Sequence, residues 1–251
     1  MKALITGASS GIGADMARVL HKKGIELWLV ARRSELLEKL SAELDGKPHI
    51  ITLDLSSEEN CYNLYESLKE ENIDILINNA GFGQFGYFSE VPVSREMEMI
   101  NLNICSLHIL TKLFLKDFEK RNSGYILNVA SSAAFLPGPL MSVYYSTKAY
   151  VLHLTEAIYQ ELKVKNKNVY IGALCPGPVD TGFNAEANVS FSLKGLSSPY
   201  VAEYAIKKMF KGKLIIIPGL KIRLGVFFQR FIPLKILLKI SYNIQKGKDK
   251  K

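Results

Sequence analysis

Short apolar segments alternate with longer segments of helical periodicity along most of the chain. Seven apolar segments have the length of strands: residues 2–6, 26–30, 49–53, 74–78, 125–130, 169–175 and 213–218. They are apolar at successive positions, which indicates strands buried on both faces. The segments between them, such as GADMARVLHKKG and SELLEKLSAEL, have the spacing of amphipathic helices. This alternation predicts an α/β fold, a doubly wound, mostly parallel seven-stranded sheet of the Rossmann type with helices on both faces.

The same pattern indicates one large domain. No linker, repeat or low-complexity run interrupts the chain before residue 211, and 251 residues with 48% hydrophobic content suffice for a full core. We expect a catalytic domain over residues 1–219 and a tail over residues 220–251 that extends the same domain. The chain enters a strand and a turn directly from its first residues, without a signal-peptide pattern, so we expect a cytoplasmic protein.

Charge is distributed unevenly. The net charge is +8, yet residues 1–210 contain 21 Lys and Arg against 23 Asp and Glu, whereas residues 211–251 contain 11 against Asp249 alone. A nearly neutral body argues against a nucleic-acid-binding protein.

The basic tail contains an amphipathic segment after Pro233. Basic residues and Pro233 break its apolar runs, so we expect no transmembrane helix there. Two interpretations stay open: peripheral contact with an anionic membrane surface, or packing on the protein's own body or on a sister subunit. Leu234, Leu237, Leu238, Ser241 and Ile244 fall on one helical face, and Lys235, Lys239 and Lys246 fall on another.

Cysteine and histidine suggest no metal chemistry. Cys61, Cys105 and Cys175 are odd in number and far apart, so we expect buried, reduced thiols. The four histidines show no metal-ligand spacing with one another or with cysteine, and we infer no metal site.

A glycine-rich turn follows the first strand and opens the first helix. Glycine permits a tight turn and lets backbone N–H groups approach a pyrophosphate at a helix N-terminus, and serine hydroxyls can add donors. The strand, turn and helix context predicts a dinucleotide site. The residues that we assign to it in LITGASSGIG are Gly7, Ser9, Ser10, Gly11, Ile12 and Gly13.

The second strand ends in LVARRSE, without the acidic residue that would hold an NAD ribose. A guanidinium binds a 2′-phosphate through charge-assisted hydrogen bonds. We therefore expect NADP(H) as the cofactor, with Arg32 as the first candidate. The alternative is that Arg33, or both arginines, are solvated charges at the start of a helix.

Further cofactor contacts are expected at the ends of the third and fourth strands, because ligands of open α/β sheets lie at the carboxyl ends of strands. Asp54 can accept a hydrogen bond from an adenine amino group, and Leu55 follows it. Asn79, Ala80 and Gly81 end the fourth strand and can line the cofactor.

Two tyrosines and a lysine stand in SVYYSTKAY, on a segment of helical pattern. Tyr144 and Lys148 are four residues apart and share a helical face, whereas Tyr145 has Ala149 at the corresponding position. A nearby ammonium favours phenolate over phenol and lowers a tyrosine pKa. A shift from about 10 to near 7 requires roughly 4 kcal/mol of differential stabilisation.

A hydroxyl that holds a substrate oxygen is available at the same edge of the sheet. Ser131 and Ser132 follow the fifth strand in NVASSAA; by itself, either serine would be interpreted as a helix cap or a loop hydroxyl. With TGASSGIG, NNAG, the serine after strand five, YSTK and PG in CPGPVDT in this order, residues 1–220 resemble the short-chain dehydrogenase/reductase family, specifically its NADP-type members.

The resemblance implies a role for each matching residue. The Tyr-x-x-x-Lys pattern falls on Tyr144, the general acid or base, and Lys148, which would lower the tyrosine pKa and bind the nicotinamide ribose. Ser131 would hydrogen-bond the substrate oxygen, and Asn103 would position a water that relays protons to the lysine, with Asn101 as its rival. The segment that would cover the nicotinamide contributes Pro176, Gly177, Val179 and Thr181.

The expected function is NADP(H)-dependent interconversion of an alcohol and a carbonyl. Residues 182–198 look irregular and suggest a substrate lid, in which Phe183, Phe191, Leu193 and Leu196 would favour a hydrophobic ketone, aldehyde or 3-oxoacyl substrate. Alternatively, these side chains only pack the lid on the body. The resemblance also implies a homodimer or homotetramer. A protein that senses NADPH or scaffolds partners without turnover is the competing function, and the intact Ser131, Tyr144 and Lys148 set argues against it.

Overall fold

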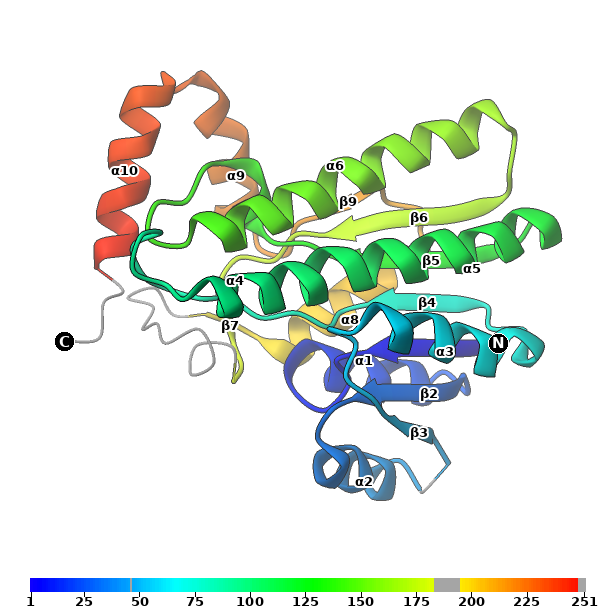
Figure 1. Ribbon diagram of the computed structural model, residues 1–251. Helices are drawn as coiled ribbons and strands as arrows, with labels where there is room; N and C mark the ends of the chain where they lie inside the picture. The colour runs from blue at the N-terminus through cyan, green and yellow to red at the C-terminus, as the bar shows by residue number, and fades with distance from the viewer. Residues whose placement is uncertain (46, 183–194, 248–251) are drawn as a thin grey trace.

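The central sheet is seven strands wide and parallel throughout. The computed structural model describes residues 1–45, 47–182 and 195–247. Within these ranges, the strands lie in the order β3-β2-β1-β4-β5-β6-β9 (Figure 1). Every neighbouring pair is parallel, which confirms the doubly wound sheet. The strands are β1 Lys2–Thr6, β2 Glu26–Ala31, β3 His49–Thr52, β4 Ile75–Asn78, β5 Gly124–Val129, β6 Val169–Leu174 and β9 Ile215–Ile216.

Two layers of helices cover the two faces of the sheet (Figure 1). Helices α1, α2 and α8 share one hydrophobic cluster with the sheet, and α3 to α6 share a second on the other face. This arrangement explains why the strands are apolar at successive positions. The bounds are α1 Gly11–His21, α2 Ser34–Glu43, α3 Glu58–Leu68, α4 Val93–Ile100, α5 Leu107–Arg121, α6 Ser142–Val164 and α8 Ser198–Met209. Short 3₁₀ turns lie at η1 Lys69–Glu71 and η3 Ser132–Phe135, and a π-helical turn lies at η2 Asn101–Ser106.

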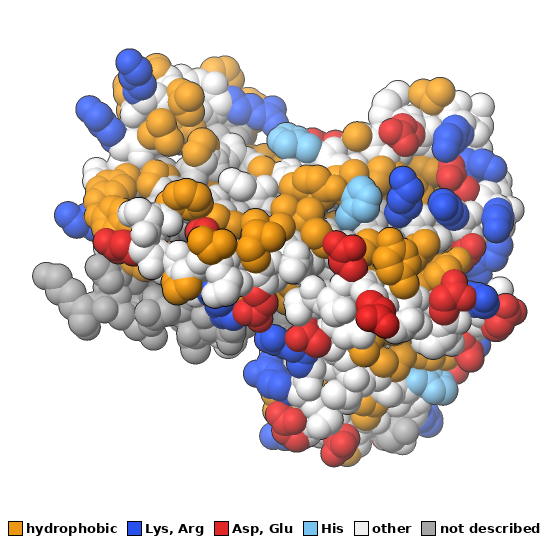
Figure 2. Space-filling model, in the orientation of Figure 1, with side chains coloured by type: hydrophobic (Ala, Val, Ile, Leu, Met, Phe, Trp, Pro, Cys, Tyr) orange, Lys and Arg blue, Asp and Glu red, His pale blue; other side chains and the backbone are white. Residues whose placement is uncertain are grey.

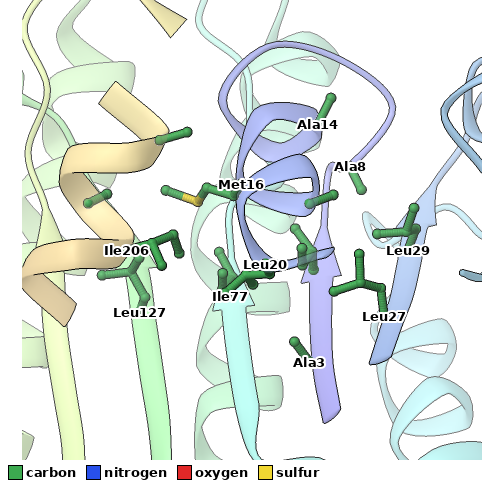
Figure 3. Packing of buried hydrophobic residues seen from close by; sticks show 14 of the residues in the cluster. Ala3, Ala8, Ala14, Met16, Leu20, Leu27, Leu29, Ile77, Leu127 and Ile206 are labelled. Atoms are coloured by element: carbon green, nitrogen blue, oxygen red, sulfur yellow. The ribbon is translucent and has the colours of Figure 1, made fainter. Parts of the chain in front are cut away.

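The packing beneath α1 fixes the loop that precedes this helix. Figure 3 shows Met16 and Leu20 of α1 and Ile206 of α8 over Ile77 and Leu127 of the sheet. All five side chains are 0% exposed. Complete burial of such a side chain stabilises the fold by about 1.5–3 kcal/mol. The start of α1 is thereby held at the carboxyl ends of the strands.

A buried polar network ties helices α5 and α6 to the sheet beneath the site. Asn78 Nδ2 on β4 donates to Asn128 Oδ1 on β5 and to Thr111 Oγ1 on α5, both at 2.9 Å. Asn128 Nδ2 in turn donates to Thr155 Oγ1 on α6 at 3.0 Å. Buried polar groups require such partners, so the network fixes the position of α6 relative to both strands.

The C-terminal segment forms two helices that stand beside the main body (Figure 1). These are α9 Leu220–Phe228, a 3₁₀ turn η4 Gln229–Phe231, and α10 Leu234–Lys246. Ser241 Oγ of α10 donates to the carbonyl oxygen of Pro137 at 3.0 Å, and Gln229 Nε2 donates to that of Phe135 at 3.1 Å. One face of the tail therefore packs on the protein's own body. No helix among the described residues has both the length and the apolarity to cross a membrane.

Candidate active site

A cavity of about 460 Å³ lies along the carboxyl ends of the central strands. It brings together nearly all residues that the sequence assigned to the site, although these come from segments far apart in the chain. The predicted residues that line it are Gly7, Ser9, Ser10, Gly11, Ile12, Arg32, Arg33, Asp54, Leu55, Asn79, Ala80, Gly81, Ser131, Tyr144, Lys148, Pro176, Gly177, Val179 and Thr181. Gly13 and Asn103 are not among the lining residues, and both support the wall from behind.

The glycine-rich turn has the backbone that its sequence predicts. Gly7 and Gly11 have φ values of +64° and +57°, a conformation that L side chains rarely adopt. An ideal Cβ at Gly13 would lie 2.5 Å from the Gly7 carbonyl oxygen and 2.5 Å from Asn79 Nδ2. That amide donates to the carbonyl oxygens of Thr6 at 3.1 Å and Gly7 at 3.0 Å. Gly13 therefore permits the close approach of turn, helix and β4 that shapes the loop.

The two arginines after β2 have different partners. Arg33 Nη2 donates to Ser9 Oγ at 3.2 Å and to Ser10 Oγ at 2.9 Å, so its charge lies over the glycine-rich turn. Arg32 Nη1 lies 3.2 Å from Glu98 Oε1 and 3.9 Å from Asp54 Oδ2. Arg33 thus donates hydrogen bonds to neutral hydroxyls. Arg32, the first candidate from the sequence, instead pairs with carboxylates.

Asp54 lies in the cleft, but its carboxylate also fixes a local turn. Oδ1 accepts hydrogen bonds from the Ser56 N–H at 3.0 Å and from Ser56 Oγ at 2.8 Å. Oδ2 faces Arg32. The side chain is 45% exposed, so it is accessible to a ligand.

Ser131, Tyr144 and Lys148 meet in the wall of the cavity. Ser131 caps η3 by accepting a hydrogen bond from the Ala133 N–H at 3.1 Å, and its hydroxyl is hydrogen-bonded to Tyr144. Lys148 Nζ donates to the carbonyl oxygen of Val129 at 2.9 Å and lies 5.9 Å from the centre of the Tyr144 ring. Ser131 is therefore a helix cap, which was the alternative interpretation from the sequence, and it also contacts Tyr144.

Burial, rather than charge, dominates the titration of the two groups. It raises the pKa of the Tyr144 phenol above its ordinary value, and the hydrogen bond with Ser131 opposes that shift. Burial also lowers the pKa of Lys148 to about 8. Removal from water disfavours both charged forms. The expected lowering of the tyrosine pKa by Lys148 would act against this burial, and it stays a prediction.

Asn103 lies in the π-helical turn η2 and is 1% exposed. Its side chain pairs with the backbone of Phe82: Oδ1 accepts from the N–H at 3.1 Å, and Nδ2 donates to the carbonyl oxygen at 2.9 Å. Nδ2 also lies 3.1 Å from Thr147 Oγ1 on α6. An ideal Cβ at Gly81 would lie 2.7 Å from Asn103 Oδ1 and 3.5 Å from Lys148 Nζ, so both side chains lie close to the space that a Cβ of this glycine would fill.

Tyr145, which has no lysine partner on its helical face, is a residue of the cavity wall. It lines the cavity, and its hydroxyl accepts a hydrogen bond from Gln245 of α10. No sequence pattern indicates this contact, because the partners are 100 residues apart. The remaining lining residues that sequence reasoning missed are Val30, Ala31, Leu53, Phe82, Leu102, Val129, Ala130, Ala133, Met141 and Pro178. They are mostly apolar and carry no motif.

The suggested lid falls largely outside the described residues. Phe183, Phe191 and Leu193 belong to the range that the structure does not describe. Leu196 lies in the short strand β8 Leu196–Ser197, which pairs in parallel with β7 Val179–Asp180.

Cys61 and Cys175 are buried as expected, whereas Cys105 is half-buried. In the described part of the chain, no group of three or more His, Cys, Asp or Glu side chains could hold a metal ion.

Comparison with known proteins gives consistent matches. The sequence model described as short chain dehydrogenase matches residues 1–190. Hydroxysteroid dehydrogenase-like protein 1 of Gallus gallus is 30% identical over 81% of this chain and 62% of its own length. The very-long-chain 3-oxoacyl-CoA reductase of Homo sapiens is 32% identical over 69% of this chain and 58% of its own length. The chain thus spans about three fifths of these curated relatives.

Solved structures agree. A short-chain dehydrogenase from Sphingobium yanoikuyae in complex with NADPH superimposes with a TM-score of 0.83 at 31% identity, over 92% of this chain and 93% of that one. The bulky-bulky ketone specific alcohol dehydrogenase from Comamonas testosteroni has a TM-score of 0.79 at 29% identity, over 92% and 91%. With its glycine-rich turn, its Tyr-x-x-x-Lys pair and these matches, the chain belongs to the short-chain dehydrogenase/reductase family.

Proposed function

We propose that this protein is an NADP(H)-dependent oxidoreductase that interconverts a carbonyl and an alcohol. The observation that carries the proposal is the meeting of Ser131, Tyr144 and Lys148 in one cavity with the glycine-rich turn. A sensor or scaffold would need the turn, but it would not need the three catalytic groups.

The cavity suits a dinucleotide along its whole length. The turn between β1 and α1 directs backbone N–H groups to a pyrophosphate, and Gly7 and Gly11 keep side chains out of its path. Arg33 and Arg32 flank the end of β2, where a 2′-phosphate would bind, with Arg33 held over the turn. The similar Sphingobium yanoikuyae enzyme was solved with NADPH, which agrees with this preference. When bound, the reduced cofactor supplies the hydride that adds to the carbonyl carbon.

Tyr144 acts as general acid in the reducing direction. Its raised pKa keeps the phenol protonated until the carbonyl oxygen gains negative charge, and the proton then moves from the tyrosine oxygen to that oxygen. Ser131 donates a hydrogen bond to the same oxygen. Lys148 lies between Tyr144 and the backbone of Val129, where it stabilises the phenolate that remains. Asn103 positions Lys148 indirectly by holding the segment that starts at Gly81.

The substrate side of the cavity favours an apolar carbonyl compound. Phe82, Met141 and Tyr145 line the cavity and pack with Tyr144 in one hydrophobic cluster. Apolar walls exclude water and bind hydrocarbon next to the reacting carbonyl. A hydrophobic ketone, an aldehyde or a 3-oxoacyl compound fits this environment. The names of the relatives, a 3-oxoacyl-CoA reductase and a hydroxysteroid dehydrogenase-like protein, agree with an apolar substrate.

The test is NADPH oxidation against a panel of ketones, aldehydes and 3-oxoacyl thioesters. Tyr144→Phe should lower kcat/KM at least about 100-fold, in the range that general acid catalysis contributes. Tyr159→Phe, on the same helix α6 and outside the residues that line the cavity, should leave it unchanged. Full activity in Tyr144→Phe would contradict the assignment. NADPH binding without turnover of any compound would favour the sensor instead.

Two expectations from the sequence stay predictions. Light scattering of the purified protein measures the oligomeric state, which we expect to be a homodimer or a homotetramer. The cytoplasmic location is measured by fractionation of cells that express the chain.

A further inference from the structure

Exposed apolar side chains are concentrated on the two C-terminal helices. Among the described residues, nine large hydrophobic side chains between Leu220 and Ile244 are well exposed, in a segment of only two short helices and a turn. Three of them are phenylalanines whose rings contact one another: Phe227 lies 5.3 Å from Phe228 and 5.7 Å from Phe231, centre to centre. They are 51%, 57% and 72% exposed, respectively. An exposed apolar cluster of this kind on a protein surface marks an interaction site.

The charge on the same helices has one sign. Residues 211–247 contain no Asp or Glu, and six Lys or Arg side chains lie between Lys221 and Lys246. Figure 2 shows orange and blue side chains together on the lobe at the upper left, where Figure 1 places α9 and α10. The surface is therefore apolar and cationic at once.

The inner face of α10 fixes which side is presented outward. Ser241 and Gln245 are buried against the body, at 2% and 1% exposure. The surface of α10 that faces away from these two residues carries Ile236 and Ile240, and Ile244 continues the stripe at its edge; all three are exposed. The face that the sequence suggested for membrane contact is thus partly the packed face, because Leu237, Leu238 and Ser241 turn inward while Leu234 and Ile244 remain exposed.

The lysines of α10 lie beside the isoleucine stripe. Lys235, Lys239 and Lys246 are exposed and fall together on the helical wheel next to Ile236 and Ile240. This is the arrangement of a helix that lies in the plane of a membrane interface, with apolar side chains in the acyl boundary and lysines at the headgroups.

We propose that the outer surface of α9, η4 and α10 docks on an anionic phospholipid membrane. Exposed phenylalanine and isoleucine side chains enter the interface, and the basic side chains pair with lipid phosphates. Each Lys or Arg near an anionic lipid surface strengthens the binding to that surface by about fivefold. A second copy of the chain fits less well, because a two-fold contact would bring this cationic surface against itself.

Docking in this orientation would bring the catalytic cavity near the membrane. Gln229 contacts the η3 turn, and an ideal Cβ at Gly177, a cavity residue, would lie 2.7 Å from Ile222 of α9. Only this consequence, that apolar substrate reaches the cavity from the lipid, rests on the proposed oxidoreductase function. The docking surface itself does not.

Co-sedimentation with vesicles tests the surface directly. The full chain should bind vesicles of phosphatidylcholine and phosphatidylglycerol in equal parts at least about tenfold more strongly than vesicles of phosphatidylcholine alone. Phe228→Ser/Phe231→Ser should weaken binding to the mixed vesicles by at least about tenfold. Lys235→Glu/Lys239→Glu should do the same, and added salt should weaken the wild type in parallel.

Matched changes elsewhere serve as controls. Val164→Ser removes an exposed apolar side chain of α6, and Lys22→Glu/Lys23→Glu reverses two exposed lysines after α1; both variants should bind like the wild type. Thermal unfolding of all variants checks that they are folded. Failure of the folded wild type to bind the mixed vesicles would overturn the proposal, and so would equal binding by the tail and control variants. Loss of a dimer on light scattering in Phe228→Ser/Phe231→Ser, without vesicle binding by the wild type, would assign the surface to a second copy instead.

Discussion

The side-chain amide of Gln245 donates a hydrogen bond to the hydroxyl of Tyr145, the residue directly after the proposed acid Tyr144. Gln245 is 1% exposed, and its Oε1 has no hydrogen-bond partner among the described residues. One contact thus links the last helix to the wall of the cavity, and it leaves a buried acceptor unpaired.

Removing Tyr145 or Gln245 from this contact should lower the free energy of unfolding by different amounts. Tyr145→Phe leaves the Gln245 amide wholly unpaired in a buried position, so we expect it to lower the free energy of unfolding by about 1–3 kcal/mol. Gln245→Leu removes the hydrogen bond together with the unpaired acceptor, and should cost less. The double variant should be close to Gln245→Leu alone, as measured by urea denaturation.

The control for these substitutions is Tyr242, which lies on α10, the helix that carries Gln245. Tyr242 pairs with Tyr87 at 3.1 Å in an exposed hydrogen bond, so Tyr242→Phe should change the free energy of unfolding by less than about 1 kcal/mol. Simple additivity of the two single substitutions at Tyr145 and Gln245 would show that they are not coupled.

Cofactor preference should depend more on Arg33 than on Arg32. Arg33→Met removes a guanidinium held over the glycine-rich turn, and should weaken NADPH binding at least about tenfold, which corresponds to one charge-assisted hydrogen bond. Arg32→Met should have a smaller effect, because Glu98 already compensates the charge of Arg32. Fluorescence titration with NADPH measures both.

NADH provides the internal control, because it lacks the 2′-phosphate. Its affinity should change by less than about threefold in Arg33→Met if the arginine binds that phosphate. A larger loss in Arg32→Met than in Arg33→Met would restore the assignment made from the sequence.

The location of the site could be read from the sequence, because its motifs follow apolar strands. Ser131, Asn79 and Gly7 each come directly after or close to the end of a strand, and parallel strands bring those ends to one edge. The spacing of Tyr144 and Lys148 likewise fixes a shared helical face. These relationships are local or follow from topology.

What could not be read depends on contacts between distant segments. The direction of Arg32 is set by Glu98, a residue of α4. The raised pKa of Tyr144 follows from its burial in the cavity wall, whereas spacing alone suggested the opposite shift. The inward face of α10 is chosen by Ser241 and Gln245, two polar residues whose partners lie about 100 positions earlier.

Asn103 should stabilise the wall of the site more than its neighbour Asn101. Asn103→Ala would leave the buried N–H and carbonyl of Phe82 without their partners, so the free energy of unfolding should fall by about 2–4 kcal/mol. Asn101→Ala, in the same π-helical turn, should cost less than about 1 kcal/mol. Urea denaturation measures both, and equal losses would show that the turn, rather than the pairing with Phe82, is what matters.

Burial of Lys148 should give the protein a characteristic dependence of stability on pH. The pKa of Lys148 is about 8 in the folded protein, against an ordinary value of 10.5. Between these two pH values the unfolded chain binds a proton that the folded protein does not, so the free energy of unfolding rises with pH. Below about pH 8 the folded protein bears the full cost of the buried ammonium, and above about pH 10.5 it bears none.

Lys148→Met removes this contribution. The difference in free energy of unfolding, wild type minus variant, should therefore rise by about 3 kcal/mol between pH 8 and pH 10.5. Tyr144, whose pKa burial raises, acts in the opposite direction above about pH 10, because the unfolded tyrosine then loses a proton that the folded one keeps. Since Tyr144 is present in both proteins, its contribution largely cancels in the difference.

The exposed Lys163 on the same helix provides the matched control. Lys163→Met removes a lysine from water rather than from the interior, so its difference from the wild type should stay constant within about 0.5 kcal/mol over the same pH range. Urea denaturation at several pH values, without added cofactor, gives all three curves. A flat difference for Lys148→Met would mean that the ammonium is solvated in the folded protein. In that case Lys148 would keep its charge up to about pH 10.5, and its burial would make no contribution to the dependence of stability on pH.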